Sequence, residues 1–388
     1  MKVVEVSAYA IRISLRKAIK HASHTRTETE NLVIRVVLED GTEGYGEGVP
    51  REYVTGESVP SGLDQLRNSQ LAAQLEPCRD FASALAAIER FRIAPVPGDD
   101  RGCVGNAARC ALEIAWLDAY GKSFGEPMCN VTKYLAPEIY RFRTKVQYSG
   151  AITGAKGFKA VLAAWKMWGY GFSQVKVKVG IEGYDDVARL RTIRARIGSK
   201  MDLRIDANEA WTPAQAIDRI RELEPFRITS AEQPVPHADV AGLKDVRAAV
   251  STPIMLDESL CSYTDGVKAI EGGWCDAFNL RLSKCGGFIP TLRLAQLAKA
   301  HNLRCQLGCQ VGESAILSAA GRNFACSVAD LKYLEGSYDR HLVREALGTT
   351  DLTFGWGGWA PAFIASGLSM SVYADGLARV TTSSERLI

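Results

Sequence analysis

The sequence predicts an α/β fold, in which a (β/α)8-type (TIM-like) barrel follows an α+β domain. Between about residues 144 and 336, short apolar segments alternate eight times with helix-like segments, as parallel strands alternate with crossover helices. The first 140 residues instead group strand-like segments ahead of helix-like ones, which is typical of an α+β domain. No low-complexity linker separates the two regions, so we expect them to interlock.

The composition is that of a globular, enzyme-sized chain, with 47% apolar and 23% charged residues over 388 positions. A net charge of only +3 gives no case for a nucleic-acid or membrane-surface binder. No apolar run has the length of a signal-peptide core or a membrane span. The ten cysteines are scattered, mostly within apolar runs, which favours reduced, buried thiols and a cytoplasmic location.

The amino-terminal domain, predicted over residues 1–140, begins with strands. Alternating apolar residues at 3–13 and 31–39 predict two of them, and an Asp-Gly pair at 40–41 predicts the turn into a third at 43–48. Helical patterns then occupy residues 61–72, 81–91 and 106–121.

The barrel is predicted over residues 144–336. Its strand candidates are residues 145–152, 174–180, 202–208, 228–234, 253–259, 277–284, 304–310 and 330–336. The clearest helical segments between them are residues 156–169, 184–198, 212–224 and 289–302. The remaining segment, 337–388, ends in strand-like residues 367–373 and 376–381, which we expect to return to the amino-terminal sheet.

One ionisable residue stands at the end of each of five consecutive barrel strands: Lys178, Asp206, Glu232, Asp257 and Lys284. An acidic residue at a strand end is often only a helix cap. Five in the same register instead place all of them on the carboxyl-end rim, where barrel enzymes keep their active sites. Three crowded carboxylates without Cys or His point to Mg2+, with Mn2+ as a substitute.

Two lysines, Lys176 and Lys178, share one face of the second strand because strand side chains alternate. Taken alone, this segment is more typical of a solvated strand face. Beside an acidic trio, both lysines would instead point into the barrel mouth, with Lys178 as the base and Lys176 lowering its pKa. Such a base removes a proton next to a carboxylate, and Lys284 opposite would return it with inversion. If the substrate carries a leaving group, the same intermediate would lose that group instead of regaining the proton.

The barrel motifs KVKVG, RIDANEAW, AEQPV, MLDES and LSKCGG resemble those of the enolase superfamily, in its muconate-lactonising-enzyme subgroup. The resemblance implies that Asp206, Glu232 and Asp257 are metal ligands, and that Lys178 and Lys284 are an acid/base pair. It also implies chemistry through an enediolate, of the kind that dipeptide epimerases and N-acylamino-acid racemases perform. The seventh strand lacks the His of the mandelate-racemase branch, which favours two lysines.

The segments GYGEGVP and YVTGES resemble the capping domain of the same family. The resemblance implies loops over the barrel mouth at residues 21–28 and 51–57. Within them, Arg26, Arg51 and Tyr53 are candidates for holding a small carboxylate substrate.

Four further residues are candidates around the substrate. Glu335 stands where dipeptide epimerases carry Asp-x-Asp to grip an ammonium group, so it remains an acceptor for a cation. Cys309 is a candidate for lining the pocket, and a small buried hydrophobe is its other interpretation. Asn208 and Glu258 neighbour the ligands and are expected to support them from behind.

Three functions stay open on the sequence. The first is a Mg2+-dependent racemase or epimerase of an amino-acid derivative or dipeptide. The second performs cycloisomerisation, dehydration or an elimination like that of o-succinylbenzoate synthase at the same site. The third is an aldolase with a Schiff base on Lys284, which leaves the carboxylates without a purpose. Whether the protein is a homo-oligomer is also open.

Overall fold

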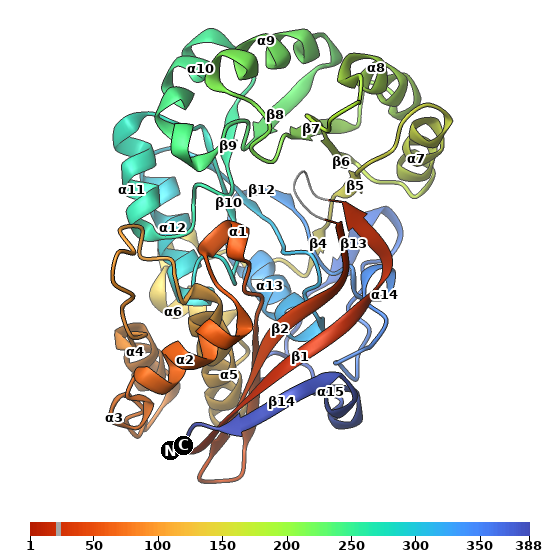
Figure 1. Ribbon diagram of the computed structural model, residues 1–388. Helices are drawn as coiled ribbons and strands as arrows, with labels where there is room; N and C mark the ends of the chain where they lie inside the picture. The colour runs from red at the N-terminus through yellow and green to blue at the C-terminus, as the bar shows by residue number, and fades with distance from the viewer. Residues whose placement is uncertain (21–24) are drawn as a thin grey trace.

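The computed structural model describes residues 1–20 and 25–388, and it places two sheets at the centre of the fold (Figure 1). One sheet is antiparallel and has the strand order β14-β1-β2-β3; the other is parallel and runs β12-β11-β10-β9-β8-β7-β6-β5. A short antiparallel pair, β4 with β13, lies outside both. The predicted fold class, a TIM-like barrel with an α+β cap, is confirmed.

The antiparallel sheet comprises β1 (Val3–Lys20), β2 (Thr25–Leu38), β3 (Glu43–Gly48) and β14 (Thr381–Arg386). The helices beside it are α1 (Glu52–Thr55), α2 (Val59–Asn68), α3 (Leu71–Gln74), α4 (Phe81–Arg90), α5 (Asn106–Phe124) and α6 (Asn130–Leu135), followed by the 3-10 turn η1 (Pro137–Ile139). The predicted strands and helices of this region are all present.

Helix α5 packs against β3 through three glycines. A Cβ added at Gly44, Gly46 or Gly48 would lie 1.9–2.2 Å from a backbone carbonyl oxygen of α5. Every second residue of the strand meets every fourth residue of the helix, because two residues of a strand and four residues of a helix cover similar lengths along their axes. The motif EGYGEG therefore sets how closely the helix approaches the sheet.

The parallel strands are β5 (Gly150–Ile152), β6 (Gln174–Lys178), β7 (Asp202–Asp206), β8 (Ile228–Glu232), β9 (Ile254–Leu256), β10 (Ala277–Leu280), β11 (Arg304–Leu307) and β12 (Leu331–Leu334). The N–H of Ser149, just before β5, donates to the carbonyl of Leu334 at the end of β12 over 2.8 Å, which connects the two edges of the sheet. Each predicted barrel strand is present. The first is interrupted, because residues 145–147 form β4 (Lys145–Gln147) and pair with β13 (Trp359–Pro361).

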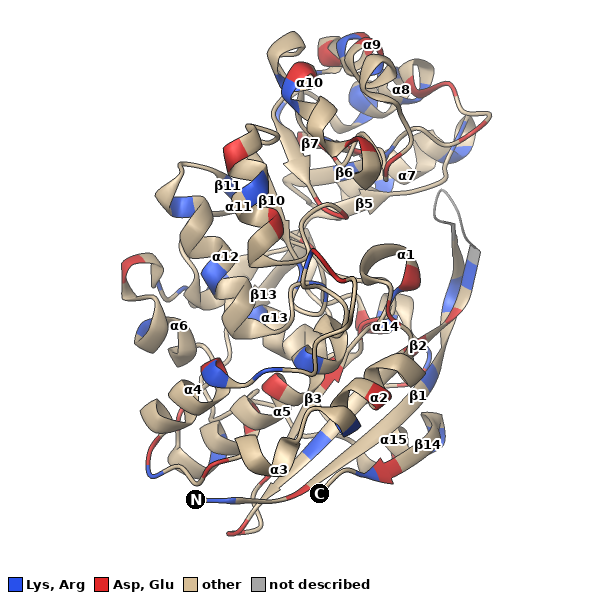
Figure 2. Cartoon of the chain, turned by 60° about the vertical axis from the view of Figure 1, so that its left-hand side comes forward, with Lys and Arg blue, Asp and Glu red and all other residues tan. Residues whose placement is uncertain are grey.

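The helices that follow the barrel strands lie on its outside (Figure 1). They are α7 (Phe158–Gly169), α8 (Asp186–Ile197), α9 (Pro213–Leu223), η2 (Glu224–Phe226), η3 (His237–Gly242), α10 (Leu243–Ala249), α11 (Tyr263–Gly272), α12 (Phe288–Ala300) and α13 (Ala315–Ser327). After the last strand come α14 (Asp339–Leu342), which contacts β1, and η4 (Trp356–Gly358). Charges of both signs lie on α8, α9 and α10 (Figure 2). None of the helices in the described ranges is both long and apolar enough to span a bilayer.

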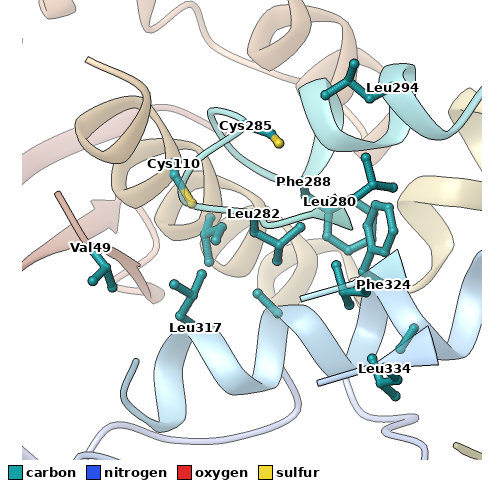
Figure 3. Close-up of a cluster of buried hydrophobic side chains, with 14 of the residues drawn as sticks. Val49, Cys110, Leu280, Leu282, Cys285, Phe288, Leu294, Leu317, Phe324 and Leu334 are labelled. Carbon is teal, nitrogen blue, oxygen red and sulfur yellow. The ribbon is translucent and has the colours of Figure 1, made fainter. Parts of the chain in front are cut away.

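Apolar side chains from both regions form one continuous core. The close-up in Figure 3 shows the part that joins α5, the end of β10, α12 and α13, with Cys110, Leu280, Leu282, Phe288 and Phe324 among the labelled residues. All ten cysteines are unpaired and nine are buried, as predicted, with Cys309 of intermediate exposure.

The predicted strand at residues 376–381 is wrong. Residues 374–380 form the helix α15 (Ala374–Val380), whose buried residues Gly376, Leu377 and Val380 recur with helical spacing. The strand that joins the amino-terminal sheet is β14, whose Arg386 pairs with Ser7 of β1. Both ends of the chain therefore meet in one sheet (Figure 1), while the domain limits at residues 140, 144 and 336 stay a prediction.

Candidate active site

Four of the predicted rim residues stand where the strands end. Lys178, Asp206 and Glu232 are the last residues of β6, β7 and β8, and Asp257 directly follows β9. Lys178 pairs in register with Asp206, and Asp206 with Glu232. Parallel pairing in this register brings the carboxylates of neighbouring strands to one level of the barrel mouth.

Lys176 lies buried among the carboxylates, and the interpretation of its strand face as solvated is wrong. Its Nζ lies 3.3 Å from Asp206 Oδ2 and 3.2 Å from Glu232 Oε1, and it donates to Glu335 Oε2 over 2.8 Å. Burial alone would lower the pKa of this amine, but the charges of Glu232, Glu335 and Asp206 outweigh burial and raise it well above the ordinary value. Lys176 is therefore a fixed cation.

The acids repel one another as their spacing predicts. Burial raises the pKa of Glu232 to about 7, with Lys176 opposing the shift and the charges of Asp206, Glu335 and Asp257 adding to it. Burial acts on Asp257 in the same sense, but Arg281 and Lys284 outweigh it and lower the pKa of that carboxyl. Removing the repulsion at Glu232 would require a further cation beside it.

The donor set fits Mg2+, since Asp206, Glu232 and Asp257 are buried carboxylates with no Cys or His among them. Within residues 1–20 and 25–388, no three Cys, His, Asp or Glu side chains already converge on a common point as in a formed metal site. Lys176 and Arg281 lie between the carboxylates instead. Metal binding would therefore require these two cations to shift.

Lys178 is held by an amide. Its Nζ donates to Asn208 Oδ1 over 2.6 Å, and Asn208 Nδ2 donates to Glu258 Oε1 over 3.1 Å. Asn208 adopts a left-handed backbone conformation, with φ of 44°, which asparagine tolerates better than most residues. Burial, followed by the charge of Asp257, raises the pKa of Glu258 well above the ordinary value. Asn208 and Glu258 thus form a chain of contacts behind the Lys178 amine.

A cavity of about 230 Å³ opens above these groups. Its polar lining includes Lys176, Lys178, Asp206, Arg281 and Glu335, together with Asn208 and Glu258, so these last two also reach the cavity. The apolar part includes Ile19 and Val54 from the amino-terminal domain and Val311 and Leu342 from the barrel loops. Tyr53 and Cys309 also line it, so these two candidates lie where they were expected.

Lys284 does not end a strand, and this part of its prediction is wrong. β10 ends at Leu280, and Lys284 lies in the turn that follows. Its Nζ is buried and donates to Asp257 O over 2.6 Å, Asp257 Oδ1 over 2.9 Å and Asn279 O over 2.9 Å. The amine therefore supports Asp257 from below, outside the cavity lining.

Arg281 is the residue that sequence reasoning missed. It directly follows β10, lines the cavity, and forms an ion pair with Asp257, with Nη2 also 3.7 Å from Glu232 Oε1. Asn279 faces the same interior, since its Nδ2 donates to Glu232 Oε1 over 2.8 Å. Residues two apart on a strand share a face, so the position of Arg281 two residues after Asn279 could have identified it from the sequence.

Arg51 is committed to the protein rather than to a ligand. Its Nη1 donates to the carbonyls of Glu30 and Pro50, and its Nη2 donates to Thr29 Oγ1 over 2.7 Å and to the carbonyl of Val311 over 2.8 Å. Arg51 thus ties the cap to a barrel loop and lies outside the lining of the cavity.

The loop containing Arg26 is only partly described, since residues 21–24 of the expected loop 21–28 lie outside the described ranges. Arg26 itself stands in β2 with its guanidinium carbon 6.0 Å from the centre of the Tyr53 ring. It too lies outside the lining of the cavity. Of the expected loop 51–57, residues 52–55 form the short helix α1.

Glu335 is neutralised by its neighbours. Its two oxygens accept from Lys176 and from Arg204, each over 2.8 Å, and Arg204 is fully buried. The charges of Lys176 and Arg204 lower the pKa of Glu335 against the effect of burial. Its carboxylate is therefore less available to a substrate cation than the sequence suggested.

The family described as enolase C-terminal domain-like matches residues 159–375. A hydrophobic dipeptide epimerase of Enterococcus faecalis is 30% identical over 84% of this chain and 88% of its own. The crystal structure of an N-succinyl Arg/Lys racemase from Bacillus cereus superposes with a TM-score of 0.86 at 26% identity, over 100% of both chains. A dipeptide epimerase of Cytophaga hutchinsonii, complexed with Mg and D-Ala-L-Val, gives 0.85 at 26% identity, also over 100% of both. The order of rim residues around the barrel, the cap closed by both chain ends and these matches agree, and the chain belongs to the enolase superfamily, in its muconate-lactonising-enzyme subgroup.

Proposed function

We propose that the protein removes the proton α to the carboxylate of an amino-acid derivative, with Mg2+ as cofactor, and that racemisation or epimerisation is the outcome. The relatives support this proposal, because they include dipeptide epimerases and an N-succinyl-L-Arg/Lys racemase. One observation carries it: Lys178 and Asp206, register partners at the ends of neighbouring strands, line the same cavity.

Lys178 acts as the base in this proposal. Its amine lies at the barrel rim and is positioned by Asn208 Oδ1, 2.6 Å away. Lys176, which contacts three carboxylates before metal binds, would shift to admit the metal and would keep a positive charge close to where negative charge develops on the substrate. The walls that Val54, Val311 and Leu342 contribute limit access of water to the reacting carbon.

Asp206, Glu232 and Asp257 would hold the metal through carboxylate oxygens. A bound Mg2+ would neutralise the substrate carboxylate and stabilise the added charge of the enediolate. Asn208 and Glu258 would keep Lys178 and the metal site in a fixed relation, since they contact one another and neighbour Asp206 and Asp257.

The ion pairs of Glu335 favour an N-acylated amino acid over a dipeptide with a free amino terminus. A substrate ammonium would have to compete with Lys176 and Arg204 for the two Glu335 oxygens. An acyl group presents no such charge, and the apolar part of the cavity suits its carbon atoms.

A second outcome, elimination or cycloisomerisation, is favoured by Arg281. It occupies the side of the cavity from which a second base would act, and arginine does not give up its proton near neutral pH. The Schiff-base aldolase has less support, because the Lys284 amine donates to three buried acceptors.

The proposal is tested by hydrogen exchange in deuterium oxide with Mg2+, using NMR to follow the α-proton of N-succinyl and N-acetyl amino acids and of dipeptides. The parent enzyme should exchange at least one N-acylated substrate faster than dipeptides, and Lys178→Met should lose exchange by at least about 100-fold. Lys166→Met, on the exposed face of α7, is the matched control and should keep the parent rate. Exchange that survives in Lys178→Met would refute the assignment of the base.

The remaining expectations are part of the same proposal. A small carboxylate is the partner, with no nucleic acid or membrane, and the cytoplasm is the location. The number of subunits is left to a measurement of mass in solution.

A further inference from the structure

Helix α7 is apolar on two opposite faces. Its inner face includes Ala160 and Ala164, which are buried. Its outer face carries four large apolar side chains that are exposed: Phe158, Leu162, Trp165 and Trp168. Positions three and four apart lie on the same side of a helix, so these four form one row along α7. A helix that is apolar all round is normally covered on every side.

The next three barrel helices have no such row. Charged residues lie on α8, α9 and α10 (Figure 2), and these helices, all within the described ranges, expose no large apolar side chain. Figure 1 shows α7 at the outer edge of the barrel, and it packs beside α8. The apolar row is therefore particular to α7 and is not a general feature of the barrel surface.

Trp356 extends the row beyond the carboxyl end of α7. Its ring centre lies 5.6 Å from that of Tyr170, and the N–H of Gly357 donates to the carbonyl of Tyr170 over 2.7 Å. Tyr170 follows Trp168 by two residues, and Trp356 is itself exposed. Together these five exposed side chains form the α7 patch: Phe158, Leu162, Trp165, Trp168 and Trp356.

The α7 patch has the area of a stable contact between two proteins. The exposed fractions are 79% for Phe158, 43% for Leu162, 57% for Trp165, 65% for Trp168 and 69% for Trp356. With about 200 Å² for a whole large side chain, they amount to about 600 Å² of apolar surface, more than most monomers expose in one place. Because about 65% of a homodimer interface is apolar, this patch corresponds to about 900 Å² per copy, the size of a standard interface.

The charges around the patch suit two copies whose α7 helices pack antiparallel across a two-fold axis. Lys166 stands towards the carboxyl end of α7. Near the amino end, the Tyr184 hydroxyl donates to the carbonyl of Gly154 over 3.0 Å, and the exposed acids Glu182 and Asp185 stand on either side of Tyr184. Antiparallel packing brings Lys166 of each copy towards the acids of the other and opposes the two helix dipoles.

We infer that the α7 patch binds the α7 patch of a second copy of this chain and that this contact makes the protein a homodimer or a larger assembly. A two-fold axis lets the same surface serve on both copies, which is the commonest arrangement in homo-oligomers. The inference does not depend on the proposed function, since none of the five patch side chains lines the cavity.

Analytical ultracentrifugation measures the association. At about 10 μM the parent should have at least twice the mass of one chain, because a standard interface holds two copies together at this concentration. Replacing both Trp165→Glu and Trp168→Glu should weaken the association by at least about 100-fold and halve the mass. Tyr263→Glu, at an exposed aromatic residue that begins α11, is the matched control and should keep the parent mass.

A cross-link tests the antiparallel geometry. Leu162 lies near the middle of α7, where the two-fold axis would pass, so Leu162→Cys should give a disulfide-linked dimer under mild oxidation with copper phenanthroline. Ile364→Cys replaces an even more exposed apolar residue outside the patch and should give no more cross-linked dimer than the parent.

Three results would each overturn the inference: a monomeric parent, an unchanged mass in the double glutamate variant, or no cross-link in Leu162→Cys. A monomeric parent that sediments with phosphatidylcholine vesicles would assign the patch to a membrane instead. Halving of the mass in Tyr263→Glu would also count against the α7 patch, since the effect would not be specific to it. Circular dichroism verifies that each variant is folded, and the cross-link decides alone if the double variant is not.

Discussion

Replacing Lys284 by methionine should destabilise the protein, because Lys284 is a buried cation paired with Asp257. Methionine keeps most of the buried stem and deletes the amine, which now contacts Asp257 O, Asp257 Oδ1 and Asn279 O. Removing one partner of a buried ion pair costs about 3–5 kcal/mol. Asp257 would keep its pair with Arg281, and its carbonyl would keep the N–H of Leu260, so we expect the lower end, about 3 kcal/mol.

Urea unfolding followed by fluorescence measures this loss. With a urea dependence of about 3 kcal/mol per molar, the midpoint should fall by about 1 M. Lys178→Met is the matched control: it deletes one contact, to Asn208, and should cost about 1 kcal/mol while losing proton exchange. If Lys284→Met unfolds at the parent midpoint and yet loses exchange, Lys284 is a catalytic group and the structural role argued here is refuted.

Three further predictions concern the cap, pH and the metal. Gly46→Ala should cost at least about 1–3 kcal/mol in urea unfolding, because its Cβ would lie 2.1 Å from the carbonyl oxygen of Ala111, and an unchanged midpoint would contradict the packing. Burial raises the pKa of Glu57 from 4.5 to about 7, so its contribution to stability is fully present below pH 4.5 and falls by up to about 3 kcal/mol as pH rises to about 7. Glu57→Gln should lack this decline, and parallel pH curves for parent and variant would be evidence against it. Removing Mg2+ with EDTA should lower the unfolding free energy by about 2.7 kcal/mol relative to Mg2+ at 100 times its dissociation constant, and an unchanged thermal midpoint would exclude specific binding.

The strand positions and the acidic trio could be predicted because both follow from local rules. A strand end is marked by the change from apolar alternation to polar residues. The number of residues from one strand end to the next is roughly constant, and this spacing shows which strand ends are neighbours. Asp206 and Glu232 came out in register for that reason. The helix α15 was missed because a seven-residue helix contains too few residues for its period to outweigh strand-like neighbours.

Lys284 was misplaced because the end of β10 is not visible in the sequence. The run from Ala277 to Lys284 alternates as if it were one strand, but the strand pairing stops at Leu280. The turn after it contains Gly286 and Gly287, both with positive φ, and these glycines allow the chain to reverse into α12. Which of the two cations, Arg281 or Lys284, reaches the cavity depends on that reversal, which no local sequence pattern specifies.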